Sequence, residues 1–271
     1  MALLTVEHLC VTYSHEGSAV RAVDDVGFAI EPGEIAALVG ESGSGKSSVA
    51  LALTRLLPPR AVVAGTVRLN GSSLLDASED RLRAVRGGHI AYIFQDPASS
   101  LNPVLTVGEQ LMEMVLFHTD VRGAEARCLA VEWLARVGIG SAGERLNAYP
   151  HEFSGGMQQR VCIAMALAAN PSLLVADEPT TALDVTVQIQ ILRLIRDLQR
   201  QLGLSVLLIS HDLTVVERLA GRLGVMQRGR LVEWGPVAQV LNKPAHPYTQ
   251  ELIRARLPPL PTSDTFSQES P

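Results

Sequence analysis

The chain has 271 residues, of which 47% are hydrophobic and 19% are charged, and its formal net charge is −5 at pH 7. This length accommodates one large domain, or a core domain with a subdomain. No apolar run approaches the roughly 18 residues that a membrane-spanning helix needs, and the first residues lack the basic region and cleavage site of a signal peptide. We therefore expect a soluble protein that stays in the compartment where it is made.

Charge and cysteine content argue against several kinds of site. The net negative charge argues against a basic surface that would bind nucleic acid. The basic residues between Arg81 and Arg86 are interpreted as the solvated face of a helix. Cys10, Cys128 and Cys162 lie far apart and form no CxxC pair. This spacing argues against a zinc site or a disulfide framework and suits a reducing cytoplasm.

The first part of the chain has an α/β pattern. It opens with two strand-like runs, Leu3–Val11 and Val20–Ile30. A short apolar strand, Ile35–Val39, then leads directly into a glycine-rich turn, and helical spacing follows over Ser47–Leu57 up to Pro58. Such a strand–loop–helix unit is typical of α/β proteins.

The middle and last parts differ from each other in periodicity. Residues 105–168 have long helical patterns with a break at Pro150, which predicts a mainly helical insertion. The α/β pattern then returns in a strand at Leu173–Ala176, a helix at Val185–Leu202 closed by Gly203, a strand at Leu204–Ile209 and a helix at Leu213–Ala220. The last segment, 257–271, is rich in proline and serine, and we expect it to fray.

A phosphate-binding loop follows the strand Ile35–Val39. The residues from Gly40 to Ser47 match the pattern G-x-x-x-x-G-K-[ST] between a strand and a helix. The backbone N–H groups of such a loop converge on phosphate oxygens, Lys46 would reach the β- and γ-phosphates, and the Ser47 hydroxyl would ligate Mg²⁺. A plain glycine–serine turn is the competing interpretation. The residues expected to bind a nucleotide here are Gly40, Ser42, Gly43, Gly45, Lys46, Ser47 and Ser48.

Two carboxylates follow the strand Leu173–Ala176. Asp177 stands at the C-terminal tip of a buried strand, where α/β sheets bind ligands, and would hold Mg²⁺ directly or through a water. Glu178 would face the γ-phosphate and orient or deprotonate the attacking water. The competing interpretation is a helix N-terminus, which the following Pro179 and Thr180 also fit.

The segment from Phe153 to Arg160 resembles the LSGGQ signature of ABC ATPases, with Phe153 in place of the first leucine and Met157 in place of the glutamine. Ser154, Gly155 and Gly156 would form a second phosphate cradle at a helix start. In the family, two subunits associate head to tail and each signature closes the ATP site of its partner. The resemblance implies an α/β fold: a P-loop NTPase (RecA-like) core with an antiparallel β subdomain and a helical signature subdomain.

The remaining landmarks of the family occur in order. Gln95, after the strand Ala91–Phe94, resembles the Q-loop residue that contacts Mg²⁺ and the water, and His211 resembles the switch histidine that hydrogen-bonds the γ-phosphate. Ala182–Asp184 resembles the D-loop, and Tyr13 stands where the family places an aromatic ring under the adenine. The resemblance therefore implies the cofactors ATP and Mg²⁺, with catalytic roles for Glu178, His211 and Gln95, a nucleotide-binding role for Asp184, and metal ligation by Ser47, Gln95 and Asp177.

The resemblance also divides the chain. It implies an ABC ATPase domain over residues 1–250, with a RecA-like core at about 1–100 and 165–240 and a helical subdomain at about 101–164. Residues 241–271 would hold a C-terminal motif and a flexible tail.

Two segments indicate which subfamily of ABC ATPases the chain resembles. The residues Phe94–Pro103 and Pro244–Thr249 resemble the ATPases that power oligopeptide, dipeptide and nickel importers, although a turn opening the last helix also explains the second segment. Some relatives carry an iron–sulfur cluster after this point, but no cysteine follows Cys162, so we expect none here.

The subfamily implies particular partners and a location. We expect membrane permease subunits, a second ATP-binding subunit (a different chain rather than a second copy) and, indirectly, an extracytoplasmic substrate-binding protein. The expected location is peripheral, on the cytoplasmic face of the cell inner membrane, with no nucleic acid bound. An ATPase of another ABC transporter class and a soluble, nucleic-acid-associated ABC ATPase remain the alternatives. The transported substrate is open.

Overall fold

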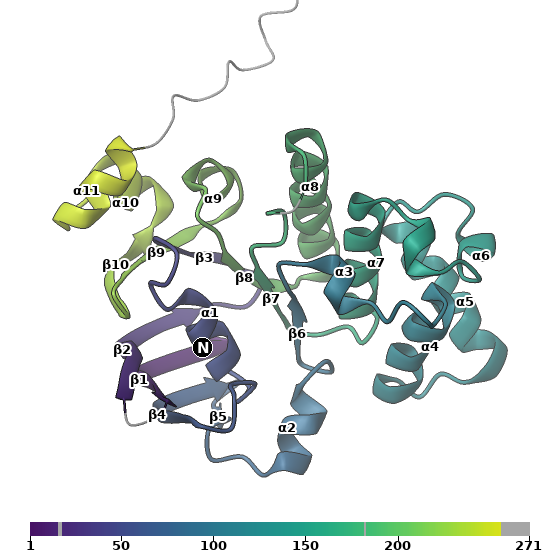
Figure 1. Ribbon diagram of the computed structural model, residues 1–271, viewed down its shortest axis with the longest axis horizontal. Coiled ribbons are helices and arrows are strands. Elements are labelled where there is room, and N and C mark those ends of the chain that lie inside the picture. The colour runs from purple at the N-terminus through teal and green to yellow at the C-terminus, as the bar shows by residue number, and fades with distance from the viewer. Residues whose placement is uncertain (16–17, 182, 256–271) are drawn as a thin grey trace, which may run out of the picture.

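The computed structural model describes residues 1–15, 18–181 and 183–255. An antiparallel sheet, a mainly parallel sheet and a group of helices lie side by side (Figure 1). The expected frayed tail and Ala182 of the D-loop-like segment lie outside the described residues. None of the helices in the described ranges has the length and hydrophobicity that crossing a bilayer requires.

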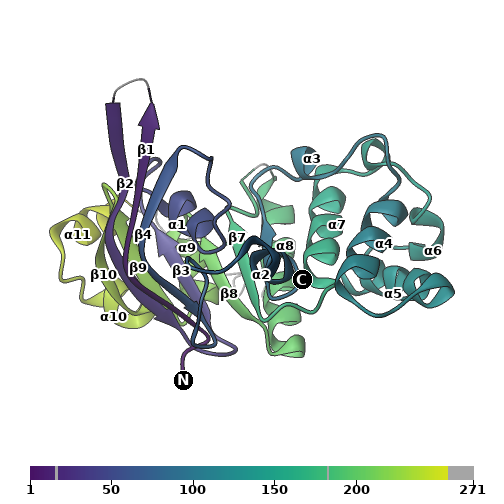
Figure 2. The ribbon, with the colours of Figure 1, turned by 90° about the horizontal axis from the view of Figure 1, so that it is seen from below.

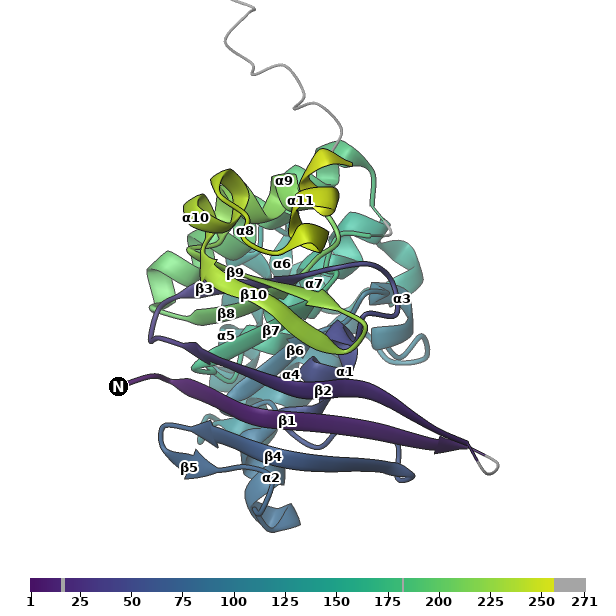
Figure 3. The ribbon, with the colours of Figure 1, turned by 90° about the vertical axis from the view of Figure 1, so that its left-hand side faces the viewer.

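The antiparallel sheet comes from the first part of the chain. Its strands follow the order β2-β1-β4-β5, as Figure 3 shows. β1 is longer than the predicted strand because it pairs on both sides: Tyr13 is opposite Val20 of β2 and Ala61 of β4. β4 and β5 were not predicted from the sequence. The bounds of the sheet are β1 Leu4–His15, β2 Ser18–Ile30, β4 Ala61–Leu69 and β5 Ser72–Ser73.

The second sheet has the strand order β10-β9-β3-β8-β7-β6. All neighbouring pairs from β9 to β6 are parallel, and β10 is antiparallel to β9. β3 and β8 are buried along their whole length, as expected for parallel strands covered on both faces. The bounds are β3 Ile35–Val39, β6 Ile90–Ile93, β7 Leu173–Asp177, β8 Ser205–Ile209, β9 Arg222–Gln227 and β10 Arg230–Pro236.

Helices connect these strands. The predicted helix at Val185–Leu202 is confirmed as α8, with Gly203 in the left-handed region at φ 65°. The helix predicted at Ser47–Leu57 was too long: α1 ends at Ala52 because the chain turns and places Arg55 at φ 54°. The bounds are α1 Lys46–Ala52, α2 Glu79–Val85, α8 Val185–Leu202, α9 Leu213–Leu219, α10 Val237–Asn242 and α11 Pro247–Arg254.

The predicted helical insertion forms one end of the molecule, opposite α10 and α11 (Figures 1 and 2). It packs around Leu111, Trp133 and Leu134, which are nearly fully buried. α7 contacts both α5 and β6, so it joins the helical end to the parallel sheet. The bounds are α3 Pro97–Ser100, α4 Val107–His118, α5 Gly123–Arg136, α6 Ala142–Arg145, the 3₁₀ turn η1 Pro150–Glu152 and α7 Gly155–Leu167.

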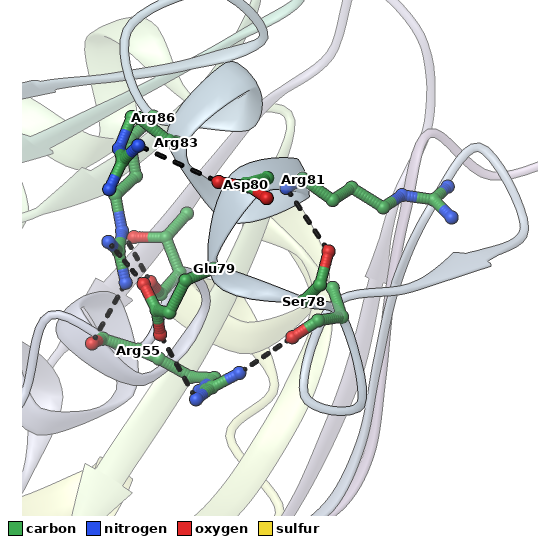
Figure 4. A network of polar contacts seen from close by, with 9 residues as sticks. Arg55, Ser78, Glu79, Asp80, Arg81, Arg83 and Arg86 are labelled. Carbon is green, nitrogen blue, oxygen red and sulfur yellow. Dashed lines mark hydrogen bonds and ion pairs between the residues drawn. The ribbon is translucent and has the colours of Figure 1, made fainter.

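The basic cluster lies on and just after α2. Arg81 and Arg83 are exposed, as predicted for a solvated helix face. Arg86 is different: it is half-buried, pairs with Glu79 at 3.2 Å and donates to the Thr54 carbonyl at 3.0 Å. Figure 4 shows Arg86 and Arg55 directed toward Glu79, with Arg81 directed away. This arginine therefore fastens α2 to the turn after α1.

Candidate active site

A cavity of about 680 Å³ opens at the carboxyl ends of the neighbouring strands β3, β8, β7 and β6. Chain segments far apart in the sequence meet there because parallel strands end at one edge of a sheet, the edge at which open α/β sheets bind ligands. The residues that line the cavity are Ala22, Ser42, Gly43, Gly45, Lys46, Ser47, Ser48, Gln95, Asp177, Glu178 and His211.

The loop from Gly40 to Gly45 depends on glycine at defined positions. Gly45 has φ 104°, and a Cβ built there would lie 2.3 Å from the Ala22 carbonyl oxygen of β2. Gly40 has φ 152°, and its Cβ would lie 2.2 Å from the Met226 carbonyl oxygen of β9. The loop is therefore pressed between the two sheets, and only glycine fits at these points.

Lys46 lies under the loop. Its Nζ donates to the Gly40 carbonyl at 2.8 Å and to the Glu41 carbonyl at 2.9 Å, and the residue is only 6% exposed. Burial lowers the pKa of this amine, while the nearby carboxylates Asp177 and Glu178 act in the opposite direction. The lysine thus provides a poorly solvated positive charge at the floor of the cavity, suited to an anionic ligand.

Asp177, at the end of β7, faces the lysine across the cavity. Burial raises the pKa of its carboxyl, and a hydrogen bond from Ser47 partly offsets that effect. The Gln95 side chain lines the same cavity. A carboxylate, a hydroxyl and an amide are the hard oxygen donors that Mg²⁺ prefers. Within the described ranges no cluster of three or more His, Cys, Asp or Glu residues could hold a metal. The donor set of Asp177, Ser47 and Gln95 fits Mg²⁺, which proteins usually bind through one or two carboxylates together with substrate phosphates.

The Glu178 carboxylate contacts three other side chains at the cavity. Its Oε2 lies 3.3 Å from His211 Nδ1, accepts from Thr181 Oγ1 at 2.8 Å and lies 3.4 Å from Gln95 Nε2. Its backbone has φ 48°, which a non-glycine residue rarely adopts and which costs on the order of 1–3 kcal/mol. The Glu178 N–H donates to the Ile209 carbonyl of β8 at 3.0 Å and holds this conformation. The carboxylate is therefore preset toward the cavity.

Tyr13 lies beside the loop but is not among the residues lining the cavity. Its hydroxyl is 3.0 Å from the Ser48 hydroxyl of α1. The ring is half-buried and packs against the cluster that contains Val49 and Leu53. This contact places Tyr13 at the edge of the site, and its stacking role stays a prediction.

The signature residues lie away from this cavity. Ser154 is the N-cap of α7 and accepts from the Met157 N–H at 3.4 Å, and Asp184 is the N-cap of α8 and accepts from the Val187 N–H at 3.0 Å. A Cβ built on Gly156 would lie 2.6 Å from Val187 Cγ1. The two helix starts are therefore packed against each other, with their capping side chains exposed.

Comparisons with known proteins decide the family. The model of the family described as "ABC transporter" matches residues 23–181. The chain belongs to the ABC transporter family. A solved structure, the dimeric ATP-binding cassette MJ0796 bound to ADP and phosphate after hydrolysis, superposes with a TM-score of 0.76 at 30% identity, over 86% of this chain and 98% of that one. The expected α/β fold of this family is therefore confirmed, and the chain is an ABC ATPase that binds ATP and hydrolyses it to ADP and phosphate.

Curated relatives of this ABC ATPase cover nearly the whole chain. A putative peptide import ATP-binding protein of Brucella abortus (strain 2308) is 49% identical over 96% of this chain and 82% of the relative. The oligopeptide transport ATP-binding protein OppD of Bacillus subtilis (strain 168) is 48% identical over 98% of this chain and 74% of the relative.

Two residues of the site were missed in the sequence. Thr181 donates its hydroxyl to the Glu178 carboxylate, and the available signal was a hydroxyl residue three positions after a carboxylate at a strand end. Ala22 approaches Gly45 of the loop with its backbone carbonyl, so the identity of its side chain gave no sign that it would lie at the site.

Proposed function

We propose that this ABC ATPase is the motor subunit of a peptide importer. The relatives that resemble it along nearly its whole length are described by their names as proteins of peptide import and oligopeptide transport. The nickel alternative has no support from these relatives. The observation that carries the motor role is the Glu178 carboxylate, held by Gln95 and His211 in the same cavity as Lys46.

The loop binds the triphosphate in this proposal. Ser42 and Gly43 line the cavity, and Gly43, whose built Cβ meets nothing within 4 Å, leaves room for a phosphate to approach the backbone N–H groups of the loop. Lys46 exchanges its carbonyl contacts for the β- and γ-phosphate oxygens. Tyr13 stacks on the adenine.

Hydrolysis in this proposal is positioning with charge stabilisation. Glu178 accepts a hydrogen bond from the attacking water and takes its proton at the carboxylate. His211 and Gln95 contact the same carboxylate oxygen and orient it, and His211 turns to the γ-phosphate once a nucleotide is bound. Ser47, Gln95 and Asp177 would hold Mg²⁺, which when bound supplies positive charge to the β- and γ-phosphate oxygens.

A head-to-tail pair of ATPase subunits completes the site in this proposal. The exposed starts of α7 and α8 carry Ser154, Gly155, Gly156 and Asp184, which would close over the partner's nucleotide. The similar cassette MJ0796 is described as dimeric. We favour a different ATPase chain as the partner.

The permease docks beside Gln95 in this proposal. Phe94 is 43% exposed next to this residue, and α3 follows directly, so a short permease helix has an apolar and polar surface to contact. The chain would then lie peripherally on the cytoplasmic face of the membrane, with a substrate-binding protein on the other side. We also propose the division into a core at about 1–100 and 165–240, a helical subdomain at about 101–164 and a C-terminal segment from 241.

The experiment is affinity purification of the tagged chain from detergent-solubilised native membranes, followed by mass spectrometry, with the untagged strain as control. Recovery of two permeases and a second ATPase supports the motor role, and peptide uptake then tests the cargo. If the tagged chain is recovered by itself, or together with ribosomes or DNA, the transport role is wrong. Recovery with an exporter's membrane subunits contradicts import.

A further inference from the structure

The C-terminal motif from Pro244 to Thr249 has no part in the chemistry described above. It forms the start of α11, at the end of the molecule opposite the helical insertion (Figures 1 and 2). Tyr248 is only 5% exposed and Thr249 only 1%. Side chains this deeply buried act within the chain rather than on an outside partner.

Glu233 of β10 anchors the motif. Its carboxylate accepts from the backbone N–H groups of Ala245, at 3.0 Å, and His246, at 3.2 Å. His246 Nδ1 in turn accepts from the Tyr248 N–H at 3.2 Å and caps α11. These bonds fix the direction in which the Tyr248 side chain leaves the helix.

Tyr248 reaches the phosphate-binding loop. The Glu41 N–H donates to the Tyr248 hydroxyl oxygen at 3.1 Å. The carbonyl of Glu41 accepts from Lys46 Nζ at 2.9 Å and from the Ser44 N–H at 3.1 Å. Glu41 is therefore held on its N–H side by the C-terminal motif and on its carbonyl side by the loop's own lysine.

We propose that Tyr248 is a positioning residue that holds the phosphate-binding loop in its ligand-ready shape and so sets nucleotide affinity. Preorganised loops bind more tightly because less ordering is left to binding. The hydroxyl acts on ATP only through Glu41 and Lys46. The inference rests on the proposed nucleotide role of this loop.

The test replaces Tyr248 by phenylalanine, which keeps the buried ring and removes the hydroxyl. Exchange of the Glu41 amide, followed by NMR without nucleotide, becomes about fivefold faster, as the loss of one hydrogen bond predicts. The Kd and KM for ATP rise by about the same factor, while kcat at saturating ATP changes by less than about twofold. Tyr149→Phe, which alters an exposed tyrosine outside the site, leaves all of these quantities at wild-type values.

The outcomes are distinct. If exchange of the Glu41 amide is unchanged in Tyr248→Phe, the proposal that the Tyr248 hydroxyl holds Glu41 is wrong. Faster exchange with an unchanged Kd, or a loss of kcat with an unchanged KM, overturns the role in affinity. If the wild-type chain binds no ATP, the nucleotide role of the loop is wrong, and so is the proposed effect of Tyr248 on affinity. The exchange measurement still shows whether the Tyr248 hydroxyl holds Glu41.

Discussion

Glu178 and His211 contact each other through Oε2 and Nδ1 at 3.3 Å, although they are 33 positions apart in the sequence. The contact follows from the sheet: β7 and β8 are parallel neighbours in which Asp177 pairs with Ile209, so the residues just beyond both strands emerge together. Gln95 joins them because β6 pairs with β7 on the other side. The order of the strands thus brings together the three residues for which we propose catalytic roles.

Gly156→Ala should destabilise the chain by about 1–3 kcal/mol because the added methyl group would lie 2.6 Å from Val187 Cγ1. Urea unfolding measures the effect. Val187→Ala in the same chain removes the colliding atom and should restore most of the loss, as a double-mutant cycle would show. If Gly156→Ala alone is as stable as the wild type, the close packing of α7 on α8 is wrong.

Ser154 offers a way to separate helix capping from phosphate contact. Aspartate and asparagine both cap helices well, so neither Ser154→Asp nor Ser154→Asn should unfold α7. In a Glu178→Gln background, ATP should make the Ser154→Asn chain dimerise with the partner ATPase chain, whereas the Ser154→Asp chain, whose charge repels the partner's phosphates, should form no dimer. Light scattering after gel filtration measures this. Equal dimerisation of both variants contradicts the proposed interface.

Glu233 gives the C-terminal motif a defined pH dependence. Burial opposes ionisation, but the N–H groups of Ala245 and His246, the Thr249 side chain and the charge interaction with His246 together outweigh it and lower the pKa of this carboxyl below its ordinary value of 4.5. The stabilisation is therefore complete above pH 4.5 and is lost as the pH falls through the lower, folded-state value. The Tm difference between wild type and Glu233→Gln should be constant near neutrality and shrink in acid. A difference that grows in acid contradicts this sign.

Local signals were enough to predict several elements. The helix α8 begins after the capping Asp184 and ends at Gly203, which adopts the left-handed conformation that closes a helix. The Gly40–Ser47 loop was also predictable from local sequence, because the residues that define its motif are consecutive in the chain. In contrast, α1 ends early in a turn whose Arg55 pairs with Glu79 of α2, a contact that no local pattern encodes.

Long-range contacts account for the rest. β4 was missed because its alternation of more and less buried residues is interrupted at Ala64 and Gly65, which are both exposed, and its pairing with β1 continues across this break. In the site, the resemblance to ABC ATPases implied that Gln95, Glu178 and His211 would lie together. The bond between Tyr248 and Glu41 joins residues 207 positions apart, and a tyrosine in the first turn of the last helix gives no sign of it.

Phosphate release from ATP by the purified chain, compared between wild type and Glu178→Gln, tests the central claim most directly. The wild type should hydrolyse ATP only with Mg²⁺ present and lose turnover when the metal is chelated. Glu178→Gln should bind ATP with wild-type affinity but turn over about 10²–10⁴-fold more slowly, the usual contribution of a general base. Steady-state hydrolysis by Glu178→Gln at the wild-type rate would contradict the assignment of this carboxylate.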